Sequence, residues 1–207
     1  MSPGLARALQ TSPGANPTLK LSPANALFYY WQNNFDLKYY WEESLRSRQI
    51  TPDVEKQIRD YFVTHLSMEP EQVLDALGTQ TGLLIKDLNM NGLLPIPELA
   101  LLIQVKEPEL IEQIVERSID RAIGMPIQTE RFNGATIQYV MLPMGGILSP
   151  AYTIRDGFCM IAVNRDVLTS MLDAPDAGSL AGHPSFQAAD RGLTDKNNQI
   201  FYVHSEG

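Results

Sequence analysis

The sequence has few residues that form cross-links or metal sites. It holds one cysteine, Cys159, so no disulfide can form within the chain. A lone thiol is equally compatible with the cytoplasm and with a bacterial envelope. The three histidines, His65, His183 and His204, are widely separated, and no pair has the helix or loop spacing of zinc ligands. We therefore expect neither a bound metal nor a cofactor.

Positive charge and long apolar runs are also scarce. Sixteen Lys and Arg residues stand against 24 Asp and Glu residues, which gives a formal net charge of −8. Phosphate binding requires a basic surface, so this balance argues against nucleic acid as a partner. No apolar run is long enough for a transmembrane segment. The first 25 residues also lack the apolar core of a signal peptide.

The sequence contains no catalytic signature. Cys159 lies in "FCMIAV", where both alternating faces of a strand would be apolar, so it is expected to be a buried and inert thiol. The glycine-rich "PMGGILSP" at 143–150 lacks the lysine and the spacing of a phosphate-binding loop. A connection between hairpins is the better interpretation of that stretch. We assign no catalytic residue.

Turn signals and hydrophobic periodicity predict the order of the elements. Residues 1–24 are rich in proline and are expected to be a flexible N-terminal arm. The dipeptides at 133–134 and 156–157, Asn-Gly and Asp-Gly, each predict a hairpin. Strands are predicted at 26–31, 83–86, 98–106 and 199–203, two-stranded hairpins at 127–142 and 151–163, and helices at 35–45, 51–66, 70–77, 109–123, 164–172 and 183–192. Because hairpins dominate, we predict one α+β domain over 25–207, with a largely antiparallel sheet and helices packed on one face.

Aromatic residues are concentrated in "FYYWQNNFDLKYYWEE", Phe28–Glu43, which holds both tryptophans. Helical spacing predicts that Tyr40 and Trp41 face the core and that Tyr39 points outward. Most of the cluster is then explained as the seam between one strand and one helix.

A second interpretation of the aromatic stretch stays open. Tyr29, Trp31 and Tyr39 are the candidate residues for an exposed surface that binds a protein partner or an apolar ligand. A membrane anchor fits less well, since Lys38 is the only basic residue beside the cluster.

One short pattern occurs twice. "NALFYYW" begins at Asn25 and "NQIFYVH" begins at Asn198, and both read Asn-x-aliphatic-Phe-Tyr-x-aromatic. Strand preference alone explains such a match. The alternative is that Asn198 begins a second copy of the unit, so that the domain is the first half of a duplication.

Residues from about Pro97 to Val203 resemble a bacterial family known as domain of unknown function 3352. The similarity lies in "PELALLIQV" followed by a helix, in the "FNGATI" hairpin, and in "AYTIRDGFCMIAVNRDVLTSMLDA". "SLAGHPSFQAA" with the final "QIFYV" also fits, and "LSPANALFYYW" resembles the first strand of the family. The resemblance implies an envelope or periplasmic location. It supplies no activity, substrate or catalytic residue, and a cytoplasmic location is not excluded.

Two functions remain open after these observations. The first is a non-enzymatic envelope domain that binds a protein partner or an apolar ligand. The second is a hydrolase whose site is assembled from residues far apart in the sequence. A pocket of apolar residues without convergent titratable groups would favour the first.

Overall fold

The computed structural model describes residues 12–90, 95–142, 148–190 and 196–204. The elements follow in the order η1 (Leu19–Leu21), β1 (Phe28–Gln32), α2 (Leu37–Arg46), α3 (Pro52–Leu66), α4 (Pro70–Ala76), β2 (Leu77–Asn89), β3 (Ile96–Val105), α5 (Pro108–Ile123), β4 (Gln128–Phe132), β5 (Ala135–Tyr139), β6 (Ala151–Arg155), β7 (Phe158–Ala162), α6 (Arg165–Ala177), η2 (Leu180–Gly182), α7 (Pro184–Ala189) and β8 (Gln199–Val203). The "PMGGILSP" stretch lies largely outside the described residues.

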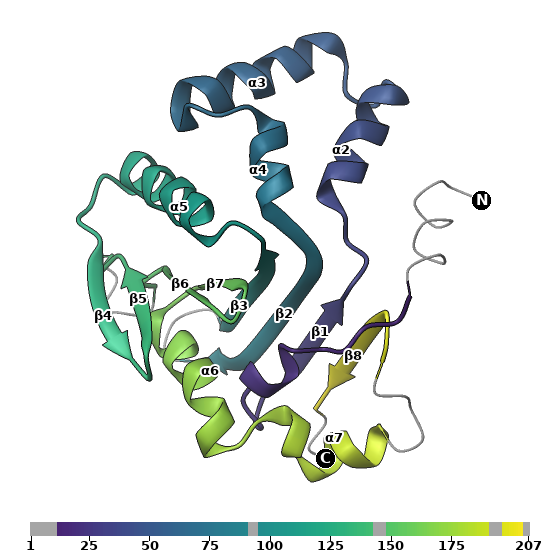
Figure 1. The fold of residues 1–207 in the computed structure, drawn as a ribbon. Coiled ribbons are helices and arrows are strands. Elements are labelled where there is room, and N and C mark those ends of the chain that lie inside the picture. Colours follow the sequence, from purple (N-terminus) through teal and green to yellow (C-terminus); the bar gives the residue numbers. More distant parts are fainter. Residues whose placement is uncertain (1–11, 91–94, 143–147, 191–195, 205–207) are drawn as a thin grey trace.

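All described strands belong to one eight-stranded sheet (Figure 1). Its order is β4-β5-β6-β7-β3-β2-β1-β8, and every neighbouring pair is antiparallel. The α+β fold with a largely antiparallel sheet is thus confirmed. β2 spans 13 residues, far more than the short strand that the sequence predicts at 83–86. Its register is interrupted between Leu77 and Thr81 and again between Ile85 and Asp87.

Two tight turns form the hairpins that the sequence predicts. Asn133 and Gly134 have φ values of 45° and 78°, and Asp156 and Gly157 have 53° and 78°. Positive φ at both central residues matches the right-handed twist of paired strands, which is why Asn-Gly and Asp-Gly are favoured there. The turns join β4 to β5 and β6 to β7.

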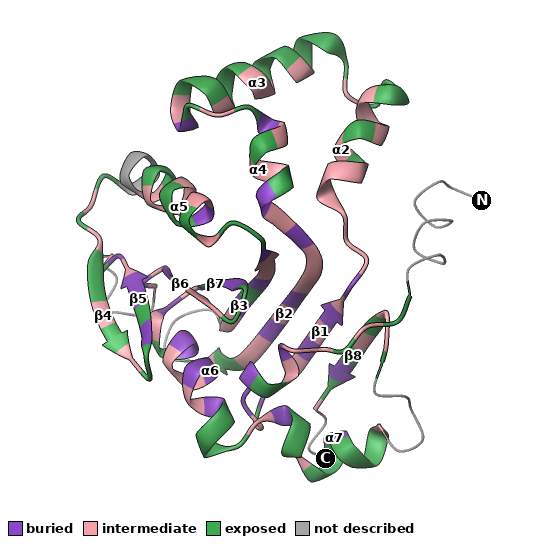
Figure 2. Cartoon of the chain, in the orientation of Figure 1, coloured by how far each residue is buried: buried purple, intermediate pink, exposed green. Residues whose placement is uncertain are grey.

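The helices are divided between the two faces of the sheet, which corrects the expected arrangement on one face. Figure 2 shows where burial is concentrated. On one face, α6 packs its apolar stripe against the strands, and this is the larger core. On the opposite face, α5 contributes Ile111 to a smaller core with Ala76, Val105 and Cys159. Alternating side chains of β3 and β7 therefore point into two different cores.

The segment before β1 is packed for most of its described length. Leu21, Thr18 and Ser22 are buried, and Gly14 forms an isolated antiparallel bridge with Asn197. The expected flexible arm is therefore wrong for residues 12–24. Residues 1–11 of that arm lie outside the described residues.

Helices α2, α3 and α4 form an arm that projects from one end of the sheet (Figure 1). α2, which is described in full, buries none of its residues. Tyr40 is 41% exposed and Trp41 is half-buried, so the predicted core face of this helix is wrong. Tyr39 is half-buried rather than outward, because the helix packs mainly on α4 and not on the sheet.

Candidate partner-binding surface

The strand β1 presents two different faces to its surroundings. Tyr29 and Trp31 are fully buried in the larger core, whereas Phe28 and Tyr30 point to the opposite face and are half-buried. The alternation is the ordinary consequence of strand geometry. The residues of interest for binding are therefore Phe28 and Tyr30 together with their cross-strand neighbours.

One row of side chains follows this second face across the sheet. Directly opposed residues share a face, so the register defines the row. Tyr30 lies opposite Phe201 on one side and Leu83 on the other. Leu83 lies opposite Leu101, and Leu101 lies opposite Ile161. Five strands thus contribute one apolar residue each, in the order β8, β1, β2, β3 and β7.

A second row beside it extends the same apolar surface. Phe28 lies between Val203 of β8 and Ile85 of β2, and Ile85 lies opposite Leu99 of β3. The rings of Phe28 and Phe201 meet edge to face, with centroids 5.2 Å apart. We call the nine residues of the two rows the open face: Phe28, Tyr30, Leu83, Ile85, Leu99, Leu101, Ile161, Phe201 and Val203.

The open face is exposed at both of its ends. Phe201 is 70% exposed and Val203 is 54% exposed, and Leu101 and Ile161 are exposed by 38% and 37%. Beyond Ile161, α5 covers the same face of the sheet. Tyr152, the next residue in the row, is accordingly buried. Helix α5 therefore covers one end of this side of the sheet and leaves the apolar rows open.

Of the three candidate surface residues, two are core residues. Tyr29 and Trp31 are 0% exposed, so neither can contact a partner without unfolding of the core. The hydroxyl of Tyr29 lies 2.7 Å from both Thr18 Oγ1 and Asn16 Nδ2. Burial raises the pKa of the Tyr29 phenol well above its usual value. Tyr39 is half-buried on the arm, away from the β1 residues, so the three do not form one surface.

Sequence reasoning missed most of the open face. Strand alternation places Leu99, Leu101, Ile103 and Val105 on one face. It does not predict that Ala100 and Leu102, on the other face, are the fully buried residues. The sequence pattern does not show which face of the sheet is exposed, because this depends on where the helices pack.

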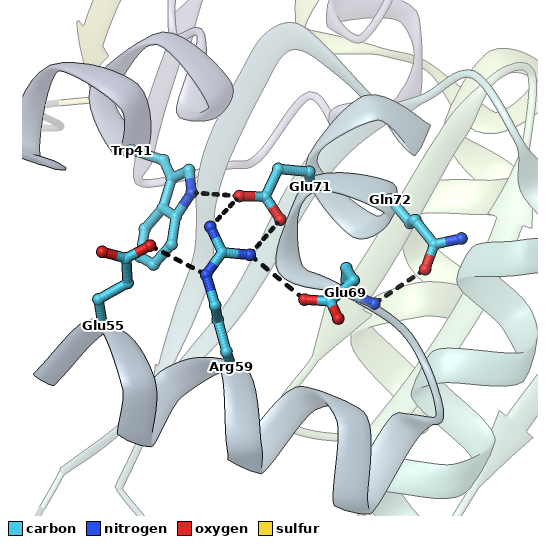
Figure 3. A network of polar contacts seen from close by, with 6 residues as sticks. All are labelled: Trp41, Glu55, Arg59, Glu69, Glu71 and Gln72. Carbon is cyan, nitrogen blue, oxygen red and sulfur yellow. Dashed lines mark hydrogen bonds and ion pairs between the residues drawn. The ribbon is translucent and has the colours of Figure 1, made fainter. Parts of the chain in front are cut away.

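The arm carries a network of polar contacts centred on Arg59 (Figure 3). The guanidinium of Arg59 forms two hydrogen bonds with the Glu71 carboxylate, at 2.6 and 2.8 Å. It also donates to Glu55 at 2.9 Å and to Glu69 at 3.2 Å. These contacts join α3 to the start of α4.

Trp41 connects α2 to the same network. Its indole Nε1 donates to Glu71 at 3.1 Å, and the Arg59 guanidinium lies over its ring at 5.9 Å from the centroid. The Arg59 hydrogen bonds lower the pKa of Glu71 to about 2, and those to Glu71 and Glu55 raise the pKa of Arg59. An arginine that donates hydrogen bonds to three carboxylates in this way holds helices together. We therefore interpret the network as structural.

A second polar group lies under α5. The amide of Gln138 donates to Glu112 and to Glu116, each at 3.1 Å. The neighbouring Tyr152 is buried, and desolvation, followed by the nearby Glu116 and Glu112 charges, raises the pKa of its phenol. Glu112 is exposed and Glu116 half-buried, so the two carboxylates face solvent at the edge of the helix.

Cys159 lies in the smaller core beneath α5 and is 2% exposed. Burial raises the pKa of its thiol to about 11. The thiolate is the nucleophilic form, so a raised pKa makes this residue a poor nucleophile at neutral pH.

Two of the histidines meet although they are far apart in sequence. The rings of His183 and His204 lie 5.2 Å apart, between the start of α7 and the end of β8. Within the described ranges, no group of three or more His, Cys, Asp or Glu side chains is placed to hold a metal ion. In the same part of the chain, no helix is long and apolar enough to span a membrane.

Comparison of the chain with family models, curated proteins and solved structures gives no match.

Proposed function

We propose that this protein is a non-catalytic binding domain of the bacterial envelope that docks a protein partner on the open face. The observation that carries the proposal is the pair of uncharged apolar rows across β8, β1, β2, β3 and β7. Contiguous exposed apolar surface is costly to keep in water and is typical of interaction sites. The envelope location is what the sequence resemblance implies.

The shape of the surface favours a protein over a small apolar ligand. Small ligands are held in concave pockets that enclose most of their surface. The open face instead follows directly opposed side chains on one side of a sheet, and its most exposed residue, Phe201, lies on the last strand. Aromatic side chains in such a position are common anchors of protein interfaces.

The surroundings of the titratable groups support binding rather than hydrolysis. The Cys159 thiol is buried with a raised pKa, and the Glu71 carboxylate is engaged by Arg59. Neither feature activates a nucleophile or a general base.

A neutral apolar dye tests the exposure of this surface. Nile red fluorescence should increase with the wild type and with Val63→Lys, whose side chain is 48% exposed on α3. Leu101→Lys adds the same charge within the open face, between Leu83 and Ile161, and should abolish most of the increase. Equal dye binding by Leu101→Lys and the wild type would refute the proposed surface. Saturable one-to-one binding of the dye would favour a small ligand over a protein.

A further inference from the structure

The strand β8 repeats the sequence of β1 and pairs with it. Four residues of one stretch correspond to four of the other: Asn25, Leu27, Phe28 and Tyr29 to Asn198, Ile200, Phe201 and Tyr202. The two strands are antiparallel neighbours at the end of the sheet. The strand that repeats the residue pattern of β1 is therefore also the strand that pairs with β1.

The register makes this pairing symmetric. Tyr29 lies directly opposite Tyr202, its equivalent in the repeat. The rings of Phe28 and Phe201, which are also equivalent, are in contact. Two identical antiparallel strands in such a register are related by a two-fold axis through the central pair. Strand preference explains the repeated residues, but it does not require this register.

We propose that β8 occupies the position that β1 of a second copy of this chain can take. Two copies associate when β8 of each copy is displaced and the two β1 strands pair. The product is a two-fold dimer in which β1 pairs with β1 of the second copy and the two sheets become continuous. Tyr29 then faces Tyr29 of the second copy, and Phe28 faces Tyr30. This inference concerns the edge of β1 and is independent of the partner proposed for the open face.

The energetics of β8 are compatible with exchange. Among the described strands β8 pairs only with β1, and Tyr202 is its one buried residue. A strand with one paired neighbour is displaced at lower cost than an inner strand, and a second copy offers a β1 edge with a similar residue pattern. Because β8 belongs to the same chain, its high effective concentration keeps the dilute protein monomeric. Weakening β8 should therefore promote the dimer.

The hydrogen-bond pattern supplies a matched pair of proline variants. At the two ends of the pair, Asn33 N donates to Asn198 O and His204 N donates to Leu27 O. Bonded pairs alternate along an antiparallel ladder, so the N–H of Ile200 points to β1 and that of Phe201 points to the open edge. Ile200→Pro breaks the ladder, whereas Phe201→Pro removes a donor that β1 does not use.

Sedimentation of the two full-length variants over a concentration series tests the proposal. Ile200→Pro should form a dimer at concentrations at which the wild type and Phe201→Pro are monomers. Ile200→Pro that stays folded and monomeric at every concentration would overturn the proposal. Equal dimerisation of the two proline variants would overturn it as well, because β8 pairing would then be irrelevant.

A disulfide experiment decides the question even if Ile200→Pro does not fold. Chains with Phe28→Cys and chains with Tyr30→Cys, both carrying Cys159→Ala and an intact β8, are mixed at high concentration under oxidation. In the proposed dimer, residues 28 and 30 form a non-hydrogen-bonded pair with Cα atoms about 4.5 Å apart, which suits a disulfide. The mixture should form cross-linked dimers that neither variant forms alone. Cross-linking no greater than in the single-variant controls would overturn the proposal.

Discussion

Replacement of Trp31 by alanine should destabilise the protein strongly, although the residue belongs to a cluster that resembles a binding surface. Trp31 is fully buried in the larger core and lies on β1 between two paired strands. Truncation of a buried tryptophan costs about 3–5 kcal/mol, because apolar contacts are lost and a cavity is left.

One feature of Trp31 reduces this cost. Its indole Nε1 is buried and has no hydrogen-bond partner among the described residues. Burial of an unpaired donor costs about 1–3 kcal/mol, and removal of the indole abolishes that penalty. We therefore expect a net loss of about 2 kcal/mol in the free energy of unfolding, which is a substantial share of a typical stability of about 5–15 kcal/mol.

Urea melts followed by far-ultraviolet circular dichroism measure the change without relying on tryptophan emission. Tyr40→Ala is the matched control from the same aromatic stretch. Its side chain is 41% exposed and its ring contacts Phe35 and Tyr39, so it should cost about 1 kcal/mol or less. The midpoint for Trp31→Ala should fall while the slope of the transition stays unchanged. Equal costs for the two variants, or a larger cost for Tyr40→Ala, would refute the placement of these side chains.

Three further variants and treatments test other parts of the structure. Tyr29→Phe should cost about 1–2 kcal/mol in urea melts, because it removes the buried hydroxyl that contacts Thr18 Oγ1 and Asn16 Nδ2, each at 2.7 Å; an unchanged midpoint would argue against those contacts. The pKa of Glu71 is lowered from 4.5 to about 2, so its contribution is complete above about pH 4.5 and is lost as the pH falls to 2. The stability difference between the wild type and Glu71→Gln should shrink over that interval, and a constant difference would contradict the Arg59 contact. Cys159 should react slowly with a thiol reagent in the native protein and rapidly in urea, because burial raises its pKa to about 11; fast native labelling would oppose its burial.

Local signals predicted the β-hairpins well. The Asn-Gly and Asp-Gly dipeptides require positive φ at both turn residues, and this requirement is encoded in two adjacent residues. The antiparallel sheet follows from such turns. Helix α6 was predicted for a similar reason, since Asn164 accepts a hydrogen bond from Val167 N and caps its first turn.

Features set by packing between distant segments were harder to predict. Spacing alone places Tyr40 and Trp41 on one face of α2, but the helix belongs to an arm that contacts α4 instead of the sheet. Proline content suggested a flexible segment before β1, whereas Leu21 belongs to the larger core and the buried Thr18 contacts Tyr29. Neither outcome depends on residues close in sequence.

The candidate surface illustrates the same limit. Strand alternation separated Tyr29 and Trp31 from Phe28 and Tyr30, but it could not show which pair was covered. The pair proposed for the surface is buried, and the other pair lies on the open face. The choice depends on the segment before β1, whose Asn16 and Thr18 contact Tyr29, and on α5, which leaves the opposite face of β1 open.

The most direct test of the proposed function is site-specific photocrosslinking in cells that produce the protein naturally. A photoreactive amino acid replaces Ile161 on the open face or, as a control, Val63 on α3, which is similarly exposed. We predict a discrete protein adduct from position 161, its loss when Leu101→Lys is added, and no such adduct from position 63. The absence of an adduct at position 161, or the same adduct from both positions, would contradict docking of a protein partner on the open face.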